Sequence, residues 1–251
     1  MTSHSDMRAS RDTGHFRRQL LPLEDMQIPP PGMVHLWFLD LTRLATPLGA
    51  PAPGTELRPR QSRSTRRFYL RLLLGAYLGL PGKDVKISRI NKGKPVLDAS
   101  RHPQTLHFSS AASANCCLIG VTSEGPLGID LELAERTTLK PRALARRYFS
   151  PAEQRALDKV AEADIHEAFI HTWACKEAVV KAAGLGIANQ LCRFTVNTDP
   201  DQPPALLELE GDDAAAWKMA VLRPDPACLA AVALRQPVLR IEGFKLLPPK
   251  T

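Results

Sequence analysis

The sequence predicts an α+β fold built from two similar halves, each with one long helix packed on a small antiparallel sheet. Apolar residues recur with helical spacing over residues 62–80 and again over 165–183, one stretch in each half. Short apolar or alternating segments surround both stretches and are bounded by Gly and Pro, which is typical of strands in small antiparallel sheets. We therefore expect two pseudo-duplicated subdomains, inferred from the order of elements and not from a sequence repeat.

The first half is predicted to follow a Pro-rich stop. Residues 29–32, Pro-Pro-Pro-Gly, can neither continue a helix nor join a central strand. The apolar run over 33–41 predicts a buried strand, and the helix over 62–80 should end at Gly79. Alternation over 85–90 predicts a further strand.

The second half is predicted to carry most of the strands and three helices. Its long helix stops at Gly184, because glycine suits the left-handed conformation that follows a helix. We expect the last four strands to form one antiparallel sheet. The other elements are strands at 106–108, 116–121, 128–133, 194–197, 206–209, 217–222 and 228–234, and short helices at 141–147 and 151–161.

These elements divide the chain into four expected parts. A mobile basic leader is expected over residues 1–32, because it holds several arginines and ends in the Pro-rich stop. An N-terminal subdomain should span 33–105 and a C-terminal subdomain 106–235. Residues 236–251 are left as a tail without an assigned role.

The composition limits the classes of protein. Of 251 residues, 44% are hydrophobic and 6% aromatic, and the formal net charge is +7, which is typical of a globular chain and excludes disorder of the whole. No apolar run reaches the ~20 residues of a membrane-spanning helix, and the polar, basic start lacks the apolar core of a secretory signal. We expect a cytoplasmic protein whose partner is acidic: nucleic acid, a phosphorylated cofactor or an acidic protein.

Five cysteines show neither a CxxC motif nor the Cys/His spacing of a zinc site, so we expect reduced and mostly buried thiols. One pair allows a sharper hypothesis. His171 and Cys175 lie four residues apart in a helical stretch and would share a face, as a base and its thiol nucleophile do. The competing interpretation is an ordinary buried cysteine.

Two carboxylates alternate on the strand predicted over 128–133. Side chains two residues apart in a strand point to the same side, so Asp130 and Glu132 would lie together while Ile129 and Leu131 face the core. Such a pair attracts a hard cation, and Mg²⁺ prefers carboxylate oxygens, water and substrate phosphates. The alternative is a solvated strand face.

An aromatic, an acidic and a basic residue form a stripe on the long second helix. Trp173, Glu177 and Lys181 are spaced by four residues and share one face, with Lys176 beside them. The alternative is a Glu–Lys pair on a solvated helix, which contributes only a few tenths of a kcal/mol.

Taken together, these two motifs resemble those of the 4′-phosphopantetheinyl transferase superfamily. The segments LGIDLE at 127–132 and WACKEAVVK at 173–181 match its signature, departing only at Ala174. Residues 148–153, YFSPAE, resemble a further family segment, although Ser150, Pro151 and Glu153 independently predict a helix-capping box.

Upstream matches are similar to the surfactin-type group, whose members are monomers with two halves. They are the GKP turn at 93–95 and the arginine-bearing helix of Arg66 and Arg67 with Arg71. One position departs from the family, because Ser110 stands where a histidine usually contacts the coenzyme phosphates. Serine carries no positive charge, so either His107 or an arginine would have to supply it.

The resemblance implies an enzyme that transfers the 4′-phosphopantetheine arm of coenzyme A to a serine of an acyl, peptidyl or aryl carrier protein, releasing adenosine 3′,5′-bisphosphate. It implies a magnesium ion, or manganese, held by Asp130, Glu132 and Glu177, with Glu177 as the preferred base. Secondary metabolism, meaning polyketide or nonribosomal peptide synthesis, is the favoured setting, and a monomer is expected. The implied catalytic residues are Glu177, Lys181 and Asp130, and the implied coenzyme contacts are Lys176, Lys181, Lys94, Arg66, Arg67, Ser109 and Ser110.

Two alternatives remain open at this point. A degenerate or regulatory homologue would bind coenzyme A poorly, which the Ser110 departure motivates. A basic module that binds nucleic acid or an acidic partner without catalysis is disfavoured, because aromatic residues are few and the strongest motif is acidic.

Overall fold

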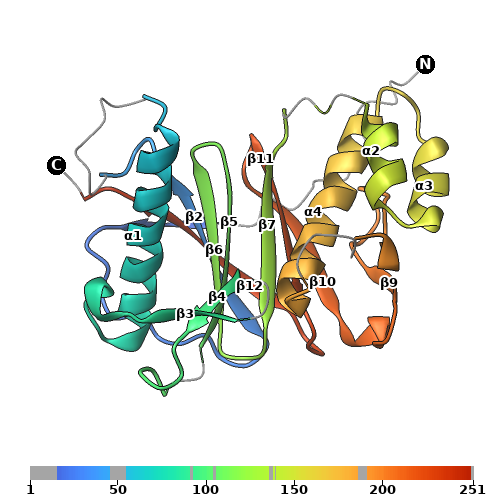
Figure 1. The fold of residues 1–251 in the computed structure, drawn as a ribbon. Coiled ribbons are helices and arrows are strands. Elements are labelled where there is room, and N and C mark those ends of the chain that lie inside the picture. The colour runs from blue at the N-terminus through green and yellow to red at the C-terminus, as the bar shows by residue number, and fades with distance from the viewer. Residues whose placement is uncertain are drawn as a thin grey trace.

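A computed structural model describes residues 16–45, 55–90, 93–103, 106–135, 138, 140–185 and 191–249. The predicted α+β class is confirmed, and the elements form four layers (Figure 1). Helix α1 (Pro59–Leu78) covers one sheet, a second sheet packs on the other face of the first, and helix α4 (Ile165–Ala183) covers the second sheet. No helix in the described ranges is long and apolar enough to cross a membrane.

The first sheet has five strands, and its central member is β2 (Met33–Asp40). This strand is mostly apolar because both of its faces are covered. Trp37 and Leu39 face α1, whereas Leu36 and Phe38 face the second sheet. The sheet order is β1 (Phe16–Leu20), β12 (Arg240–Leu247), β2, β6 (Cys116–Thr122) and β5 (His107–Ser113), parallel from β1 to β2 and antiparallel beyond.

Strands β1 and β12 correct the predicted division of the chain. The leader was expected to be mobile, yet β1 lies inside it, and the tail contains β12, which inserts between β1 and β2. Phe244 is buried and stacks on Trp37 with ring centroids 4.5 Å apart, so the tail completes the core under α1. Residues 1–15 lie outside the described part of the chain. The expected border between the subdomains after residue 105 does not separate the two sheets, because β5 and β6, which follow it, belong to the first sheet.

Helix α1 begins three residues earlier than predicted. Pro59 occupies its first turn, where the missing N–H costs nothing, and the side chain of Gln61 accepts a hydrogen bond from the backbone N–H of Arg58. The helix ends at Leu78, two residues short of the predicted range, and the predicted stop Gly79 follows it in the left-handed conformation, with φ of 63°. A 3-10 turn, η1 (Gly82–Asp84), and the hairpin of β3 (Ile87–Ile90) and β4 (Lys94–Leu97) follow.

The second sheet differs from the prediction in its membership. The four C-terminal strands do not form one sheet, because β10 (Lys218–Asp225) and β11 (Cys228–Leu234) pair with β7 (Leu127–Leu133). Strands β8 (Phe194–Val196) and β9 (Leu206–Leu209) form a separate pair. A short 3-10 helix, η3 (Leu191–Arg193), precedes β8, and another, η4 (Ala214–Ala216), lies between β9 and β10.

Helix α4 lies unusually close to β7, and Gly128 is the reason. A Cβ atom at this position would overlap the backbone of Ala178 and Ala182 on the helix. The close approach brings the predicted acidic strand against the predicted helix stripe. Helices α2 (Pro141–Tyr148) and α3 (Pro151–Asp158) flank α4 on its outer side (Figure 1).

Candidate active site

The site forms where β7 meets α4. The Nζ atom of Lys181 lies 2.6 Å from Oδ1 of Asp130, and 4.0 Å from Oε2 of Glu177. Asp130 and Glu177 are both buried, with 6% of each residue exposed. The structure therefore brings together one lysine and two acids that the sequence predicted from two separate motifs.

One carboxylate oxygen in this group is left without a partner. Oδ2 of Asp130 is buried and accepts no hydrogen bond from any residue that the structure describes. A buried anionic oxygen without a donor is costly, so its position is suited to a cation. Glu132 is also buried and lies two residues further along β7.

Glu177 has an unusual proton affinity. Burial raises the pKa of Glu177 to about 7, and the negative charges of Asp130 and Glu132 add to this rise, although Lys181 acts against it. A carboxylate with a pKa near neutrality is well matched to accept a proton at physiological pH.

In this structure the acidic side chains are not close enough together to form a complete metal site. No three carboxylate, histidine or cysteine side chains within the described ranges are gathered tightly enough to hold an ion. Asp130, Glu132 and Glu177 nevertheless offer only oxygen donors, which is the chemistry that magnesium prefers. The unpartnered Oδ2 of Asp130 fits such a cation, so this ligand set remains a prediction.

Lys176 is not a phosphate contact in this structure, which corrects its predicted role. Its side chain is 0% exposed, and Nζ donates to both carboxylate oxygens of Glu153, at 2.6 and 2.7 Å, and to the carbonyl of Phe194 at 2.7 Å. All three of its N–H donors are used. Glu153 also completes the predicted capping box with Ser150, so the pair fixes α3, α4 and β8 together.

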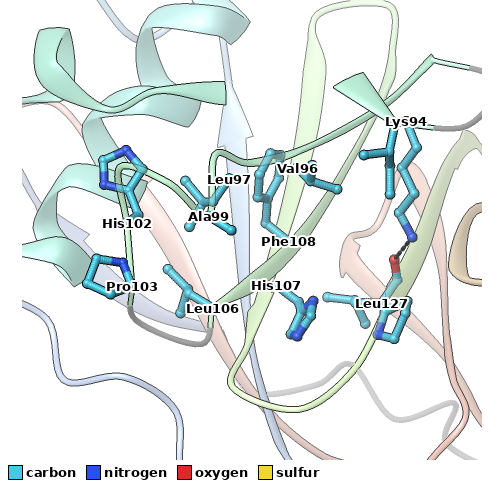
Figure 2. A pocket seen from close by; sticks show the side chains of 12 residues that line it. Lys94, Val96, Leu97, Ala99, His102, Pro103, Leu106, His107, Phe108 and Leu127 are labelled. Atoms are coloured by element: carbon cyan, nitrogen blue, oxygen red, sulfur yellow. Dashed lines mark hydrogen bonds between the residues drawn. The ribbon is translucent and has the colours of Figure 1, made fainter. Parts of the chain in front are cut away.

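Lys94 joins the two halves of the molecule through backbone carbonyls. Its Nζ atom donates to the carbonyl oxygens of Lys181, Ala182 and Leu127 at 2.6, 3.2 and 3.3 Å. Burial lowers its pKa. Figure 2 shows the bond to Leu127 at the rim of an apolar pocket of about 420 Å³, which His107 also lines. Lys94 thus anchors the end of α4, and its predicted coenzyme contact remains untested.

The predicted arginines line a larger pocket, of about 630 Å³, between α1 and the β3–β4 hairpin. Arg66, Arg67 and Ser110 of β5 all line this pocket. Arg71, which the sequence placed on the same helix, lines the pocket too. Sequence reasoning missed Arg63 and Arg89 as members of this group, because the group forms only when the helix and the hairpin lie next to each other.

This pocket answers the question raised by Ser110. Ser110 and the arginines line the same pocket, whereas His107 lines the other pocket. The positively charged groups of the pocket that Ser110 lines are therefore arginines, and His107 is not among them. Ser109 points to the opposite face of β5, where its Oγ accepts a hydrogen bond from the backbone N–H of Ile129 at 3.2 Å. It supports β7, which differs from its predicted role as a coenzyme contact.

The remaining helix residues have structural roles. Trp173 is half-buried and packs edge-on against Tyr148, with ring centroids 5.7 Å apart. The Sγ of Cys175 lies 3.9 Å from Nε2 of His171, but both are buried, and burial raises the pKa of Cys175 to about 12. Because both side chains are buried, the structure favours the ordinary buried cysteine over the hypothesis of a Cys–His nucleophile.

A lysine and two buried carboxylates that converge between a strand and a helix are typical of an enzyme active site. Comparison with known proteins agrees. The family model of the 4′-phosphopantetheinyl transferase superfamily matches residues 126–232. The 4′-phosphopantetheinyl transferase HetI of Nostoc sp. is 34% identical over 213 residues, which cover 80% of this chain and 87% of that protein. The chain therefore belongs to the 4′-phosphopantetheinyl transferase superfamily, and it is a transferase.

Other relatives are similar over shorter stretches. The 4′-phosphopantetheinyl transferase psf-1 of Bacillus pumilus is 32% identical, over 67% of this chain and 68% of that protein. Among solved structures, the holo-[acyl-carrier-protein] synthase of Thermotoga maritima aligns with a TM-score of 0.33 at 21% identity, over 43% of this chain and 61% of that chain.

Proposed function

We propose that this protein, acting as a monomer, transfers the 4′-phosphopantetheine arm of coenzyme A to a serine hydroxyl of an apo acyl or peptidyl carrier protein. Adenosine 3′,5′-bisphosphate is the second product. The observation that carries the proposal is the buried group of Asp130, Glu177 and Lys181, with one unpartnered oxygen and one carboxylate of near-neutral pKa. The family to which the chain belongs supports the same reaction.

The two ends of coenzyme A match two parts of the molecule. Its nucleotide end carries a 3′-phosphate, and the arginine pocket offers Arg66 and Arg67 for charge-assisted hydrogen bonds to it. Strand β5 borders this pocket through Ser110 on one face and contacts β7 through Ser109 on the other, so this strand connects the pocket to the acidic strand. The proposed reaction requires the pyrophosphate to extend from the pocket past the edge of β5 to Lys181.

Magnesium is the metal that we assign to Asp130, Glu132 and Glu177. When bound, it would neutralise charge on the pyrophosphate oxygens. Lys181 adds a second positive charge from the helix side of the site. Glu177 accepts the proton of the carrier serine hydroxyl, and its raised pKa makes it an effective base near pH 7.

The bond changes are those of a phosphoryl-group displacement. The serine oxygen forms a bond to the phosphorus that bears the pantetheine, and the bond from this phosphorus to the bridging pyrophosphate oxygen breaks. The bridging oxygen leaves with the adenosine 3′,5′-bisphosphate, and Lys181 is placed to stabilise the negative charge that develops on it. The carrier is expected to be acidic, because opposite charge speeds its encounter with a protein of net charge +7.

Intact mass spectrometry of two apo carriers, one acyl and one peptidyl, tests the proposal. Each is incubated with the protein, coenzyme A and magnesium, alongside an EDTA control and a Glu177→Gln variant. We expect a gain of one phosphopantetheine on at least one carrier, lost in both controls. If calorimetry detects no coenzyme A binding and no carrier gains mass, the degenerate-homologue alternative holds instead.

A further inference from the structure

Two cysteines face each other across the layer between the sheets. Cys116 is the first residue of β6 in the first sheet, and Cys228 is the first residue of β11 in the second. Because side chains alternate along a strand, Cys116 points to the same side as Leu118, and Cys228 to the same side as Ala230. All four belong to the apolar cluster between the two sheets, in which Cys116 packs at the margin.

Both cysteines also lie at the same end of that layer. The turns that precede β6 and β11 reach the same edge of the two sheets (Figure 1). An ion pair closes the edge, because Nζ of Lys245 in the first sheet lies 2.9 Å from Oδ2 of Asp225 in the second. Asp225 is the register partner of Cys228 on β10. The backbone at this edge is therefore held in position from both sides.

The two thiols influence each other's proton affinity. A side-chain hydrogen bond between them lowers the pKa of Cys116 and raises that of Cys228, while burial raises both pKa values. Asp40 and Asp225 act against the first shift, and Lys245 favours it. Cys116 is also partly exposed, whereas Cys228 is fully buried. Of these two thiols, Cys116 is thus the one that a soluble reagent meets first.

We propose that Cys116 and Cys228 are a reversible disulfide site that fastens the two sheets together when a small-molecule disulfide oxidises the protein. The Cys116 sulfur attacks one sulfur of that disulfide, whose S–S bond breaks, and the first small thiol leaves with a proton. The Cys228 sulfur then loses its proton to solvent and attacks Cys116 in the mixed disulfide. A second small thiol is released. The protein gives up two electrons, and the small disulfide is reduced to two thiols.

The consequence for the fold follows from the strands that the bond would join. Strand β11 pairs with β7, and Ala231 lies opposite Asp130 in that register. A bond from β6 to β11 closes a long loop of chain and limits separation of the sheets on unfolding. The oxidised protein should therefore unfold at a higher temperature than the reduced protein.

The test is oxidation of the full chain with oxidised glutathione, followed by alkylation under denaturing conditions and non-reducing peptide mass spectrometry. A Cys117→Ser background removes the neighbouring thiol, which faces the α1 side and whose pKa burial raises to about 12. We expect a cross-linked peptide pair containing Cys116 and Cys228, reversed by dithiothreitol. In a further Cys228→Ser variant, we expect oxidation to stop at a glutathione adduct on Cys116.

The matched control is Cys192→Ser, since Cys192 is the exposed cysteine on η3 and lies apart from both sheets. This variant should form the cross-link as well as the parent does and show the same rise in melting temperature on oxidation. The proposal is overturned if both Cys116 and Cys228 are recovered alkylated while Cys192 carries glutathione. A cross-link to any other cysteine overturns it too. Neither readout depends on transferase activity.

Discussion

The ammonium group of Lys181 lies 2.6 Å from the carboxylate of Asp130, although 51 positions separate the two residues in the chain. The contact exists because Gly128 lets α4 approach β7 without a clash. A cation is thereby held against one oxygen of Asp130 while the other oxygen has no donor among the described residues. Besides Lys181, the carboxylate of Asp130 can therefore bind a further cation.

Replacing Asp130 should abolish transfer and leave the fold intact. In Asp130→Asn the buried side chain keeps its size but loses the charge that binds a cation, so we expect kcat/KM to fall at least ~100-fold. Carrier phosphopantetheinylation followed by intact mass measures the loss. Circular dichroism and the melting temperature report the fold.

Asp199→Asn is the matched control for this substitution, because Asp199 is a solvent-facing residue between β8 and β9. It should leave the rate unchanged. Full activity in a folded Asp130→Asn protein would contradict the assignment of Asp130 to the active site.

Breaking the buried ion pair should destabilise the protein more than any substitution in the open part of the site. Lys176→Met leaves the carboxylate of Glu153 buried without its countercharge, and we expect a loss of about 3–5 kcal/mol in the free energy of unfolding. Urea denaturation measures the change.

The double variant Lys176→Met/Glu153→Gln separates charge from shape. A glutamine at position 153 carries no charge, and its one amide oxygen can still accept a hydrogen bond from the backbone N–H of either Ser150 or Val196, which now bond to different oxygens of Glu153. We expect it to recover part of the lost stability and to bind coenzyme A with unchanged Kd. A large rise in Kd would restore Lys176 as a phosphate contact.

The role of Lys176 shows where sequence reasoning reached its limit. Helical spacing correctly placed Glu177 and Lys181 on one face, and it put Lys176 next to them. The position of Lys176 depends on how α4 is covered, and α2, α3, β8 and all three strands of the second sheet contact this helix. Burial on nearly all sides cannot be derived from spacing alone.

Strand β12 was missed for a different physical reason. Its residues 240–247 alternate only weakly, and its two partners, β1 and β2, lie more than 200 residues away in the chain. Pairing over such distances leaves no local pattern. By contrast, α4 was predicted to the residue, because Gly184 marks its end and apolar spacing covers its whole length.

The arginine pocket should read the 3′-phosphate of coenzyme A. Arg66 is held toward this pocket by a hydrogen bond from Nε to the carbonyl of Ser62. Because a charge-assisted hydrogen bond is worth about 1.5–3 kcal/mol, Arg66→Ala should raise the KM for coenzyme A roughly tenfold or more. With dephospho-coenzyme A, which lacks that phosphate, the KM should not change.

Arg60→Ala serves as the control for the Arg66 experiment. Arg60 lies on the same helix, is exposed and does not line the pocket. An equal effect of Arg66→Ala and Arg60→Ala would show only the general attraction between a basic protein and an anion. An equal effect on both coenzymes would place the 3′-phosphate elsewhere.

Stability should fall in mild acid because of His35. Its neutral ring is fully bonded: Nδ1 lies 2.8 Å from the Tyr77 hydroxyl, which itself accepts from the Trp37 indole at 2.9 Å, and Nε2 lies 3.2 Å from Glu242. Burial lowers the pKa of His35 to about 4, and Arg17 adds to this shift. The Glu242 carboxylate favours the charged ring, but its ion pair with Arg17 offsets that attraction.

The sign of the effect follows from proton binding in the two states. In the unfolded chain His35 has a pKa of 6.5 and binds a proton as the pH falls below that value. In the folded protein its pKa is about 4, so the ring stays neutral until the pH approaches 4. This contribution to stability is therefore complete above pH 6.5 and is lost as the pH falls toward 4. We expect this contribution to amount to about 1–3 kcal/mol, measured as a decrease of the urea midpoint with falling pH.

In His35→Gln the urea midpoint should decrease less over this pH range. In His166→Gln, on the partly exposed first turn of α4, it should decrease as in the parent protein. An unchanged slope in His35→Gln would show that other groups cause the acid sensitivity.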